Sequence, residues 1–337
     1  MARQPTVSVI ITSYTTERLR DVYELLDSIR TQTYPNIETI FVAERSEDLY
    51  RRVEDYSRER FPPARPSQAA EPVGLKLLFN DGEPGLSAAR NLGIKHAKGE
   101  LIAFVDDDAL LYPDWAEQVV RSLEDHSIAG VTGCALPLWE DESMAWLPEE
   151  FYWIISCTGW SNWDETREIR NAWGMNMCFK REAFDLAGPF LNNFGFHKGP
   201  MAEDNEFSLR VRARTGKRIL YCPNIWLWHK VHRYRLSQRF VRERAYWIGH
   251  SRRMLKKLYP EVDTGTGLLN QEHQLLKRIL TRVPFDILKT FFRNPTIAWH
   301  KLTVVTVALF FVTLGYYSHL LPNLWLTTKA EARSDSA

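Results

Sequence analysis

Three consecutive carboxylates, Asp106, Asp107 and Asp108, are the residues of this sequence with the most distinctive chemistry. They follow residues 101–105, a short apolar run that is typical of a buried strand. Because neighbouring carboxylates repel one another, three of them at one strand end need a counter-charge. A divalent cation with a phosphate-bearing ligand would supply that charge. The alternative is a solvated loop that caps the helix beginning near Pro113.

The spacing within the triplet suits a metal site. Asp106 and Asp108 stand at positions i and i+2, so both side chains can project to the same side and share one metal ion. Ligands of open α/β sheets bind at the carboxyl ends of strands, where these aspartates would lie. His229 could complete the metal shell beside Asp108, since manganese-like ions accept imidazole and carboxylate together. A packed or hydrogen-bonded histidine is the alternative.

Two further predicted strands also end in an acid. Glu44 follows residues 37–43, and Asp81 follows residues 75–79. The N–H and O–H groups of a nucleobase or ribose can donate to carboxylates on such a common sheet edge. Capping of the following helices would explain one or two of these acids, but it explains Glu44, Asp81 and Asp106 together less well.

A cation and a second pair of acids lie elsewhere in the chain. Arg90 falls about one turn into the helix that follows Gly85. Its guanidinium could contact a pyrophosphate, hold the aspartates of the next strand, or lie on the surface. Glu203 and Asp204 precede the helix predicted for residues 206–214, and a helix N-terminus favours ionised carboxylates. Simple capping is the alternative for this pair.

The elements that must position these residues alternate regularly. Apolar strand patterns and amphipathic helix patterns follow one another, with strands at 7–11, 37–43, 75–79, 101–105 and 128–136 and helices at 18–32, 47–60, 86–96, 181–187 and 206–214. This alternation predicts an α/β fold with a mostly parallel sheet flanked by helices. Residues 137–173 form an aromatic-rich insertion, which could bind sugars or a membrane interface, or form a second small core.

Composition narrows the class of protein. The net charge of +1 provides no general attraction to nucleic acid, and no recognised nucleic-acid module is present. The four cysteines are far apart and fit reduced thiols in a cytosolic protein. The N-terminus lacks the apolar core of a signal peptide. We therefore expect the catalytic part of the chain to stay in the cytoplasm.

The C-terminal third has a different character. Residues 230–257 contain ten Lys or Arg and one acid, interleaved with aromatic side chains, which favours a membrane-surface segment. Within it we expect Arg239, Arg242 and Arg244 to face anionic headgroups. Residues 302–321 contain no Asp, Glu, Lys or Arg and are long enough to span a bilayer, although a buried or re-entrant helix is possible. Basic residues before this stretch place the N-terminal part on the cytoplasmic side.

Several of these motifs together resemble family 2 glycosyltransferases of the GT-A fold. The resemblance covers residues 6–231 and includes VSVIITSY, Glu44, the run PGLSAARNLGIKHAKGELIAFVDDD and the later Glu203-Asp204. The segment VAERSEDLYRRV is similar to a subset, the archaeal glucosyl-dolichyl-phosphate glucuronosyltransferases. The chain departs from the family pattern in two places: Thr12 stands where many members have Pro, and Ala43-Glu44 stands where two aspartates are common.

The resemblance implies a role for each candidate residue. Nucleotide-sugar binding falls to Thr12, Tyr14, Glu44, Asp81, Arg90 and Asp106. Asp108 would bind the metal, Mn²⁺ or Mg²⁺, with His229 as its further ligand. Asp204 would be the catalytic base, and the acceptor side would include Trp173, Asn176 and Glu203.

The predicted function is that of a membrane-bound inverting glycosyltransferase. It would move a sugar from a nucleotide sugar, such as UDP-glucuronate, to a saccharide on dolichyl or polyprenyl phosphate. The alternatives are transfer directly to the lipid phosphate, exopolysaccharide synthesis, an inactive nucleotide-sugar-binding scaffold, and a nucleic-acid-binding protein that uses the basic arm. We expect a catalytic domain at 1–228, basic membrane-surface helices at 229–295, a membrane segment at 296–328 and a polar tail at 329–337.

Overall fold

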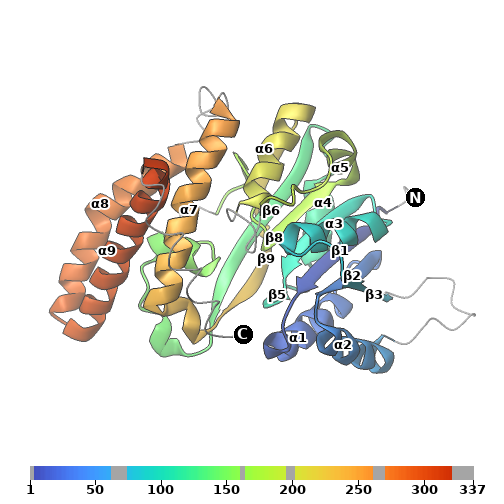
Figure 1. Ribbon diagram of the computed structural model, residues 1–337, viewed down its shortest axis with the longest axis horizontal. Helices are drawn as coiled ribbons and strands as arrows, with labels where there is room; N and C mark the ends of the chain where they lie inside the picture. Colours follow the sequence, from blue (N-terminus) through green and yellow to red (C-terminus); the bar gives the residue numbers. More distant parts are fainter. Residues whose placement is uncertain (1–3, 62–73, 160–163, 195–201, 261–269, 321–337) are drawn as a thin grey trace, which may run out of the picture.

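The computed structural model describes residues 4–61, 74–159, 164–194, 202–260 and 270–320. Within these ranges one nine-stranded sheet has the order β3-β2-β1-β4-β8-β6-β9-β5, and β7 pairs with β9 (Figure 1). The strands are β1 Val7–Ser13, β2 Ile37–Glu44, β3 Leu75–Asn80, β4 Leu101–Asp106, β5 Ala109–Leu111, β6 Ile128–Trp139, β7 Arg167–Ile169, β8 Asn176–Lys180 and β9 Arg218–Val231. The predicted polar tail and the last part of the predicted membrane segment lie outside the described residues.

Helices cover both faces of this sheet. They are α1 Leu19–Arg30, α2 Glu47–Arg60, α3 Leu86–His96, α4 Trp115–Ser122, α5 Arg181–Ala187 and α6 Glu203–Thr215. Apolar residues of α1, α2 and α4 pack on one face, and those of α3, α5 and α6 pack on the other. The predicted helix-flanked α/β fold is therefore confirmed.

The direction of the strands differs between the two halves of the sheet. β1 is parallel to β2 and β4, and β2 is parallel to β3, as the strand–helix alternation predicts. β8 is antiparallel to both β4 and β6, so the sheet is mixed beyond β4. The regular alternation of strands and helices ends after β4. Parallel pairing was predicted from that alternation, so the prediction does not extend to the later strands. β5 and β7 were not predicted because three residues are too few to produce a periodic pattern.

A layer of three helices stands beside the sheet (Figure 1). These helices are α7 Gln238–Leu258, α8 Asn270–Phe291 and α9 Pro295–Tyr317. Their apolar residues form a core with the insertion that follows β6, including the 3-10 helix η3 Glu149–Ile155, whose Phe151 is fully buried. In the part of the insertion that the structure describes, Phe151 and its neighbours therefore form the second small core that was one of the interpretations of residues 137–173.

The contact between α7 and α9 depends on two glycines. A Cβ atom at Gly249 of α7 would lie 2.0 Å from the carbonyl oxygen of Val312. A Cβ atom at Gly315 of α9 would lie 1.9 Å from the carbonyl oxygen of Tyr246. Because no side chain fits in either place, the two helix backbones touch directly.

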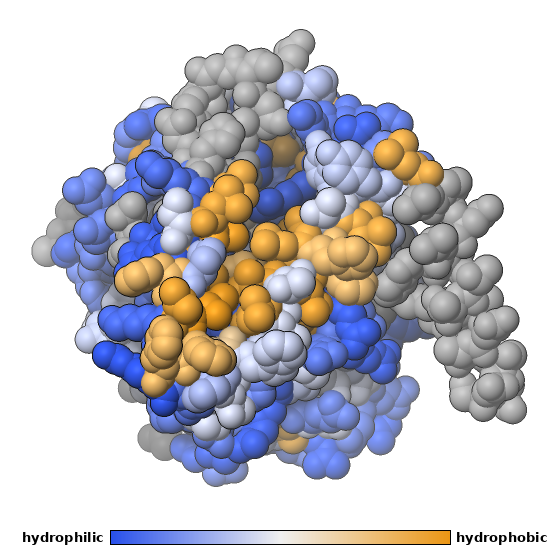
Figure 2. All heavy atoms as spheres, turned by 90° about the vertical axis from the view of Figure 1, so that its left-hand side faces the viewer, coloured by the Kyte–Doolittle hydropathy of each residue, from blue (hydrophilic) through white to orange (hydrophobic). Residues whose placement is uncertain are grey.

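Among the described residues, the stretch Pro295–Leu320 is the one helical segment whose length and composition would allow it to cross a membrane. It has 26 residues and contains an 18-residue window with a mean hydropathy of 1.8. Figure 2 looks at the molecule from the side of α8 and α9 and shows apolar residues gathered over this face, with polar residues around them.

Candidate active site

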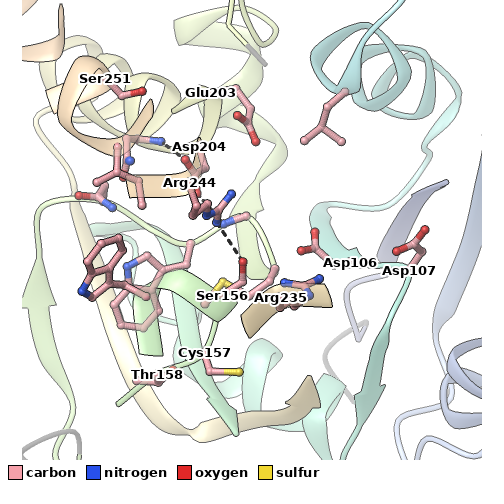
Figure 3. Close-up of a pocket in the computed structure, with 18 of the residues that line it drawn as sticks. Asp106, Asp107, Ser156, Cys157, Thr158, Glu203, Asp204, Arg235, Arg244 and Ser251 are labelled. Carbon is pink, nitrogen blue, oxygen red and sulfur yellow. Dashed lines mark hydrogen bonds between the residues drawn. The ribbon is translucent and has the colours of Figure 1, made fainter. Parts of the chain in front are cut away.

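A cavity of about 610 Å³ lies at the carboxyl edge of the sheet. The ends of β1, β2 and β4 contribute one part of its wall, with the first turns of α3 and α6. The turn after η3, the 3-10 helix η4 Arg233–Leu236, and one face of α7 contribute the rest (Figure 3). Parallel strands whose carboxyl ends meet at one edge explain why residues far apart in the sequence surround this space.

Asp106, Asp108 and His229 form the group best suited to hold a metal ion. Each offers one ligand atom, and these atoms lie within 4.8 Å of one another. The strand order brings them together, because β5 begins directly after Asp108 and pairs with β9 so that Ala109 stands opposite His229. His229 Nε2 lies 3.2 Å from Asp108 Oδ1 and 3.6 Å from Asp106 Oδ2.

The unsatisfied atoms of this group also fit a metal. Asp108 Oδ1 and both ring nitrogens of His229 are buried, and none has a hydrogen-bond partner among the described residues. Buried polar atoms rarely remain without partners, so these are candidates for ligation. Carboxylate and imidazole are a ligand set that Mn²⁺ and related ions accept. The residues present therefore fit the predicted divalent cation.

Two arginines hold the other side of the aspartate triplet. Arg235 Nη2 lies 2.6 Å from Asp108 Oδ2, and Arg18 Nη1 lies 3.2 Å from the same oxygen. Arg18 also donates to Asp107 Oδ1 at 2.7 Å. Burial by itself would raise the pKa of Asp108, but the charges of His229, Arg235 and Arg18 together hold that pKa well below its usual range. Asp108 is thus ionised and is ready to bind a cation.

Asp204 lies on the cavity wall in the first turn of α6. Its Oδ2 accepts a hydrogen bond from the Gly174 backbone N–H at 2.8 Å, and its Oδ1 accepts one from the Asn205 N–H at 2.7 Å. Burial and then the neighbouring charge of Glu203 raise the pKa of Asp204 to about 6. A carboxylate with a raised pKa on a cavity wall is suited to accept a proton near neutral pH.

Arg90 connects the two acidic groups. Its Nη1 donates to Glu203 Oε1 at 2.9 Å, and its Nη2 lies 3.7 Å from Asp106 Oδ1. Nη2 also donates to the carbonyl oxygen of Gly174 at 3.2 Å. The surface interpretation of Arg90 is excluded because Arg90 is buried; its hydrogen-bonded acid is Glu203, and Asp106 is the aspartate nearest to it. Glu203 is correspondingly engaged in an ion pair at the cavity wall.

The predicted nucleotide-binding residues separate into two sets. Thr12, Tyr14 and Glu44 line the cavity together with Arg90 and Asp106. Glu44 is buried, and it accepts hydrogen bonds from the Asn80 side chain and from the Gly85 N–H, so it holds the turn before α3. Asp81 is exposed and does not line the cavity.

The predicted acceptor-side residues also separate. Trp173 lines the cavity, and so does Glu203. Asn176 does not, because its side chain is buried inside the sheet. There it accepts a hydrogen bond from Trp115 Nε1 and donates to the carbonyl oxygens of Cys134 and Ile225. We therefore place Asn176 among the residues that hold the sheet together.

Some cavity residues were not predicted in this role. Arg18 and Ser156 line the cavity although nothing in their local sequence indicates it. Arg235 and Arg244 belong to the basic stretch that was predicted to face lipid headgroups, but both turn inward and line the cavity. For Arg244 that prediction was wrong. A helix that covers a cavity must present one face to it, and the charge pattern alone does not tell which arginines lie on that face.

Comparison with known proteins gives a consistent result. The sequence profile described as glycosyl transferase family 2 matches residues 8–185. A glucosyl-dolichyl phosphate glucuronosyltransferase of Haloferax volcanii is 30% identical over 324 residues, which cover 94% of this chain and 97% of that protein. A succinoglycan biosynthesis protein, ExoM of Rhizobium meliloti, is 25% identical over 58% of this chain and 64% of its own length.

The fold also has a counterpart among solved structures. The mannosyltransferase PcManGT from Pyrobaculum calidifontis, solved in complex with GDP-Man and Mn²⁺, superposes with a TM-score of 0.61 at 17% identity. The match covers 94% of this chain and 88% of that one. At this level of identity the likeness concerns the fold.

Proposed function

This chain belongs to glycosyl transferase family 2, and from that premise we propose that it is an inverting, membrane-associated enzyme that transfers a sugar from a nucleotide sugar to a lipid-linked saccharide. One observation carries the proposal: Asp106, a member of the Asp106–Asp108–His229 group, and Asp204 line the same cavity, with Asp108 and His229 buried directly behind Asp106. An inverting displacement needs a site for the leaving nucleotide diphosphate on one side of the anomeric carbon and a base on the other.

The residues of the chain divide the chemistry between them. Mn²⁺ or Mg²⁺ held by Asp106, Asp108 and His229 would supply Lewis-acid stabilisation of the donor's diphosphate. Asp204 takes the proton of the acceptor hydroxyl as that oxygen attacks the anomeric carbon. The bond from this carbon to the phosphate oxygen breaks on the opposite face, so the configuration at the carbon inverts. Arg90 fixes the position of the base through Glu203.

The donor side follows from the cavity lining. Thr12, Tyr14 and the turn held by Glu44 are placed to contact the nucleoside, next to the diphosphate position at Asp106. We take a glucuronate-bearing nucleotide, UDP-glucuronate, as the donor and glucose linked to dolichyl phosphate as the acceptor. The Haloferax relative, aligned over 97% of its length, is named as a glucuronosyltransferase that acts on glucosyl-dolichyl phosphate.

The acceptor determines where the enzyme works. A dolichyl chain remains in the bilayer, so the enzyme must reach the membrane surface. Exposed apolar residues of α8 and α9 supply a surface for this contact (Figure 2), and exposed Lys277, Arg282, Lys289 and Arg293 of α8 and its end can attract anionic headgroups. The boundary expected at 228 falls inside β9, so the catalytic domain in this proposal extends to the end of β9 at Val231 and lies on the cytoplasmic side.

The full chain in detergent can be tested with a panel of nucleotide sugars and Mn²⁺, with a short-chain prenyl phosphoglucose as acceptor. We expect transfer from UDP-glucuronate and a product whose new linkage is β, since the donor linkage is α. A product with retained configuration would contradict the mechanism. Preferred transfer to unmodified prenyl phosphate would instead identify an enzyme that acts directly on the lipid phosphate.

A further inference from the structure

Arg244 is a half-buried cation whose role the donor chemistry does not explain. It lies on α7, lines the cavity, and has a buried guanidinium Nε. Its Nη2 donates a hydrogen bond to Ser156 Oγ at 2.9 Å (Figure 3). Burying a charge is costly, so a guanidinium kept on a cavity wall is expected to serve a binding purpose there.

Ser156 has an unusual backbone conformation that keeps its hydroxyl beside Arg244. Its φ of 58° and ψ of 39° lie in the left-handed region, which residues other than glycine seldom adopt. The turn is fixed on both sides: the Cys157 N–H donates to the carbonyl oxygen of Tyr152, and Thr158 exchanges two hydrogen bonds with Ala135 of β6. Such strained positions concentrate at ligand-binding sites.

The surrounding wall combines cations with an apolar path. The cavity-lining residues of α7 from its second turn onward are Arg244, Ile248, Ser251, Arg252 and Leu255, whose spacing places them on one face of the helix. Leu275 of α8 continues the apolar part of this face. The face therefore presents a guanidinium at two points with aliphatic side chains between and beyond them.

A second cation lies close to the first. Arg235 lines the same cavity, and burial followed by the like charge of Arg235 lowers the pKa of Arg244. The charges of Asp204, Asp106 and Glu203 partly offset this lowering, and an anion bound at this wall would offset it further. Arg244 Nη2 donates to Ser156 Oγ on the cavity wall, so Arg244 can contact such an anion from the α7 side.

We propose that Arg244 and Ser156 form an oxyanion-binding subsite of the transfer cavity, which takes a charged phosphate or carboxylate group of a substrate. This inference rests on the proposed function, which supplies two such groups: the phosphate that joins sugar and lipid in the acceptor, and the carboxylate of a glucuronate donor. The guanidinium donates a fork of N–H groups to the oxygens, and the Ser156 hydroxyl can donate alongside it. The aliphatic path along α7 fits a lipid chain that leaves from a phosphate.

Paired substrates test the subsite and identify the group that it binds. One pair consists of a short-chain prenyl phosphoglucose and an alkyl glucoside without phosphate; the other consists of UDP-glucuronate and UDP-glucose. For the charged member of one pair, Arg244→Gln should lower kcat/KM by roughly 10- to 100-fold relative to the neutral member, since a hydrogen bond to a charged group is lost. Loss in the acceptor pair identifies the phosphate, and loss in the donor pair identifies the carboxylate.

Two further variants separate binding from folding. Ser156→Gly keeps the left-handed backbone without strain and removes the hydroxyl. It should therefore reduce the preference for the charged over the neutral substrate without lowering the melting temperature. Arg242→Gln is the matched control, because Arg242 is exposed on the same helix and donates to Gln238; both preferences should stay as in the wild type. Equal loss on charged and neutral substrates in Arg244→Gln would overturn the proposal and leave Arg244 a structural role.

A binding measurement keeps the subsite testable apart from the proposed function. Calorimetric titration of the full chain with a short-chain prenyl phosphate and with glucuronate needs no turnover. At least one of these anions should bind the wild type and bind Arg244→Gln more weakly. If the wild type turns over no nucleotide sugar but shows this difference, the proposed function fails and the subsite stands. If neither anion distinguishes the two proteins, the subsite is refuted.

Discussion

At the scale of single residues, the two oxygens of Asp108 have different partners. Oδ1 lies 3.2 Å from His229 Nε2, whereas Oδ2 is held by Arg235 and Arg18. This division lets one fully buried carboxylate contribute a ligand atom while its remaining charge stays paired. Buried ion pairs are strongly sensitive to the loss of one partner, because the other charge is left uncompensated.

Asp108→Asn should therefore abolish Mn²⁺ binding and sugar transfer together. The change also leaves Arg235 without its counter-charge, so we expect a loss of about 3–5 kcal/mol of stability. Manganese binding by electron paramagnetic resonance, measured at a temperature where both proteins are folded, separates the two effects. Asp55→Asn, on the exposed face of α2, is the control. Full transfer by Asp108→Asn in excess chelator would contradict the assigned metal site.

The raised pKa of Asp204 predicts a pH dependence. A general base must be ionised, and burial with the charge of Glu203 raises the pKa of Asp204 to about 6. Activity should thus fall as the pH drops through about 6, where Asp204 becomes protonated. Asp204→Asn should lower kcat by ~10²–10⁴-fold and remove this acidic limb. An unchanged acidic limb in the variant would assign the titration to another group, and a near-normal rate would indicate an acceptor that is already ionised.

Which residue contacts could be predicted from the sequence depends on how local they are. Asp108 and His229 were proposed as neighbours because strand ends and ligand chemistry are visible in the sequence. The arginine that pairs with Asp108 was not predictable, since nothing in a stretch with ten Lys or Arg distinguishes Arg235 from the others. Asn176 is the opposite case. The family resemblance placed it on the acceptor side, but its side chain forms hydrogen bonds within the sheet.

At the scale of secondary structure elements, β9 and α7 build most of the site. β9 is paired on one edge with β6 and on the other with β5 and β7, so His229 is fixed beside Asp108. α7 then covers the cavity and is itself held by α9 through the contacts of Gly249 and Gly315. Helix periodicity predicts that such helices exist, but glycine contacts between helices far apart in the sequence carry no local pattern.

This helix contact predicts that Gly315→Ala will disturb the cavity. The added Cβ would overlap the carbonyl oxygen of Tyr246, so α7 and α9 must move apart at a cost of roughly 1–3 kcal/mol or more. Because α7 lines the part of the cavity that we propose for the acceptor, KM for the acceptor should rise while KM for the donor changes little. Thr313→Ala, on the exposed side of α9, is the control for helix propensity. Equal stability of Gly315→Ala and the wild type would show that the backbones are not in firm contact.

At the scale of the whole molecule, the arrangement of α7 and α9 bears on how the chain meets a membrane. By length and composition α9 could span a bilayer. It packs, however, along α7, which carries Arg239, Arg242, Arg252, Arg253, Lys256 and Lys257. Carrying α7 into hydrocarbon would bury these charges at high cost. We therefore expect α8 and α9 to lie in the interface, with their exposed apolar side in the lipid.

The exposed phenylalanines of this face provide the test. Phe285, Phe292 and Phe310 are 67%, 80% and 60% exposed, so replacing all three with Ser removes membrane contact without opening the core. Burying each apolar side chain of this size in lipid stabilises membrane association by roughly 1.5–3 kcal/mol. The triple variant should therefore move from vesicles to the soluble fraction. It should still glycosylate a water-soluble short-chain acceptor, because the cavity residues are unchanged.

The decisive comparison uses a long-chain acceptor in vesicles, to which the triple variant should transfer poorly. Leu186→Ser is the matched control, because Leu186 is also exposed but belongs to α5 on the catalytic domain. That variant should remain on vesicles and stay active. A triple variant that still sediments with vesicles would place the membrane contact elsewhere on the molecule. A triple variant that is soluble yet fully active on the vesicle-bound acceptor would show that lipid contact through α8 and α9 is not what delivers the acceptor to Asp204.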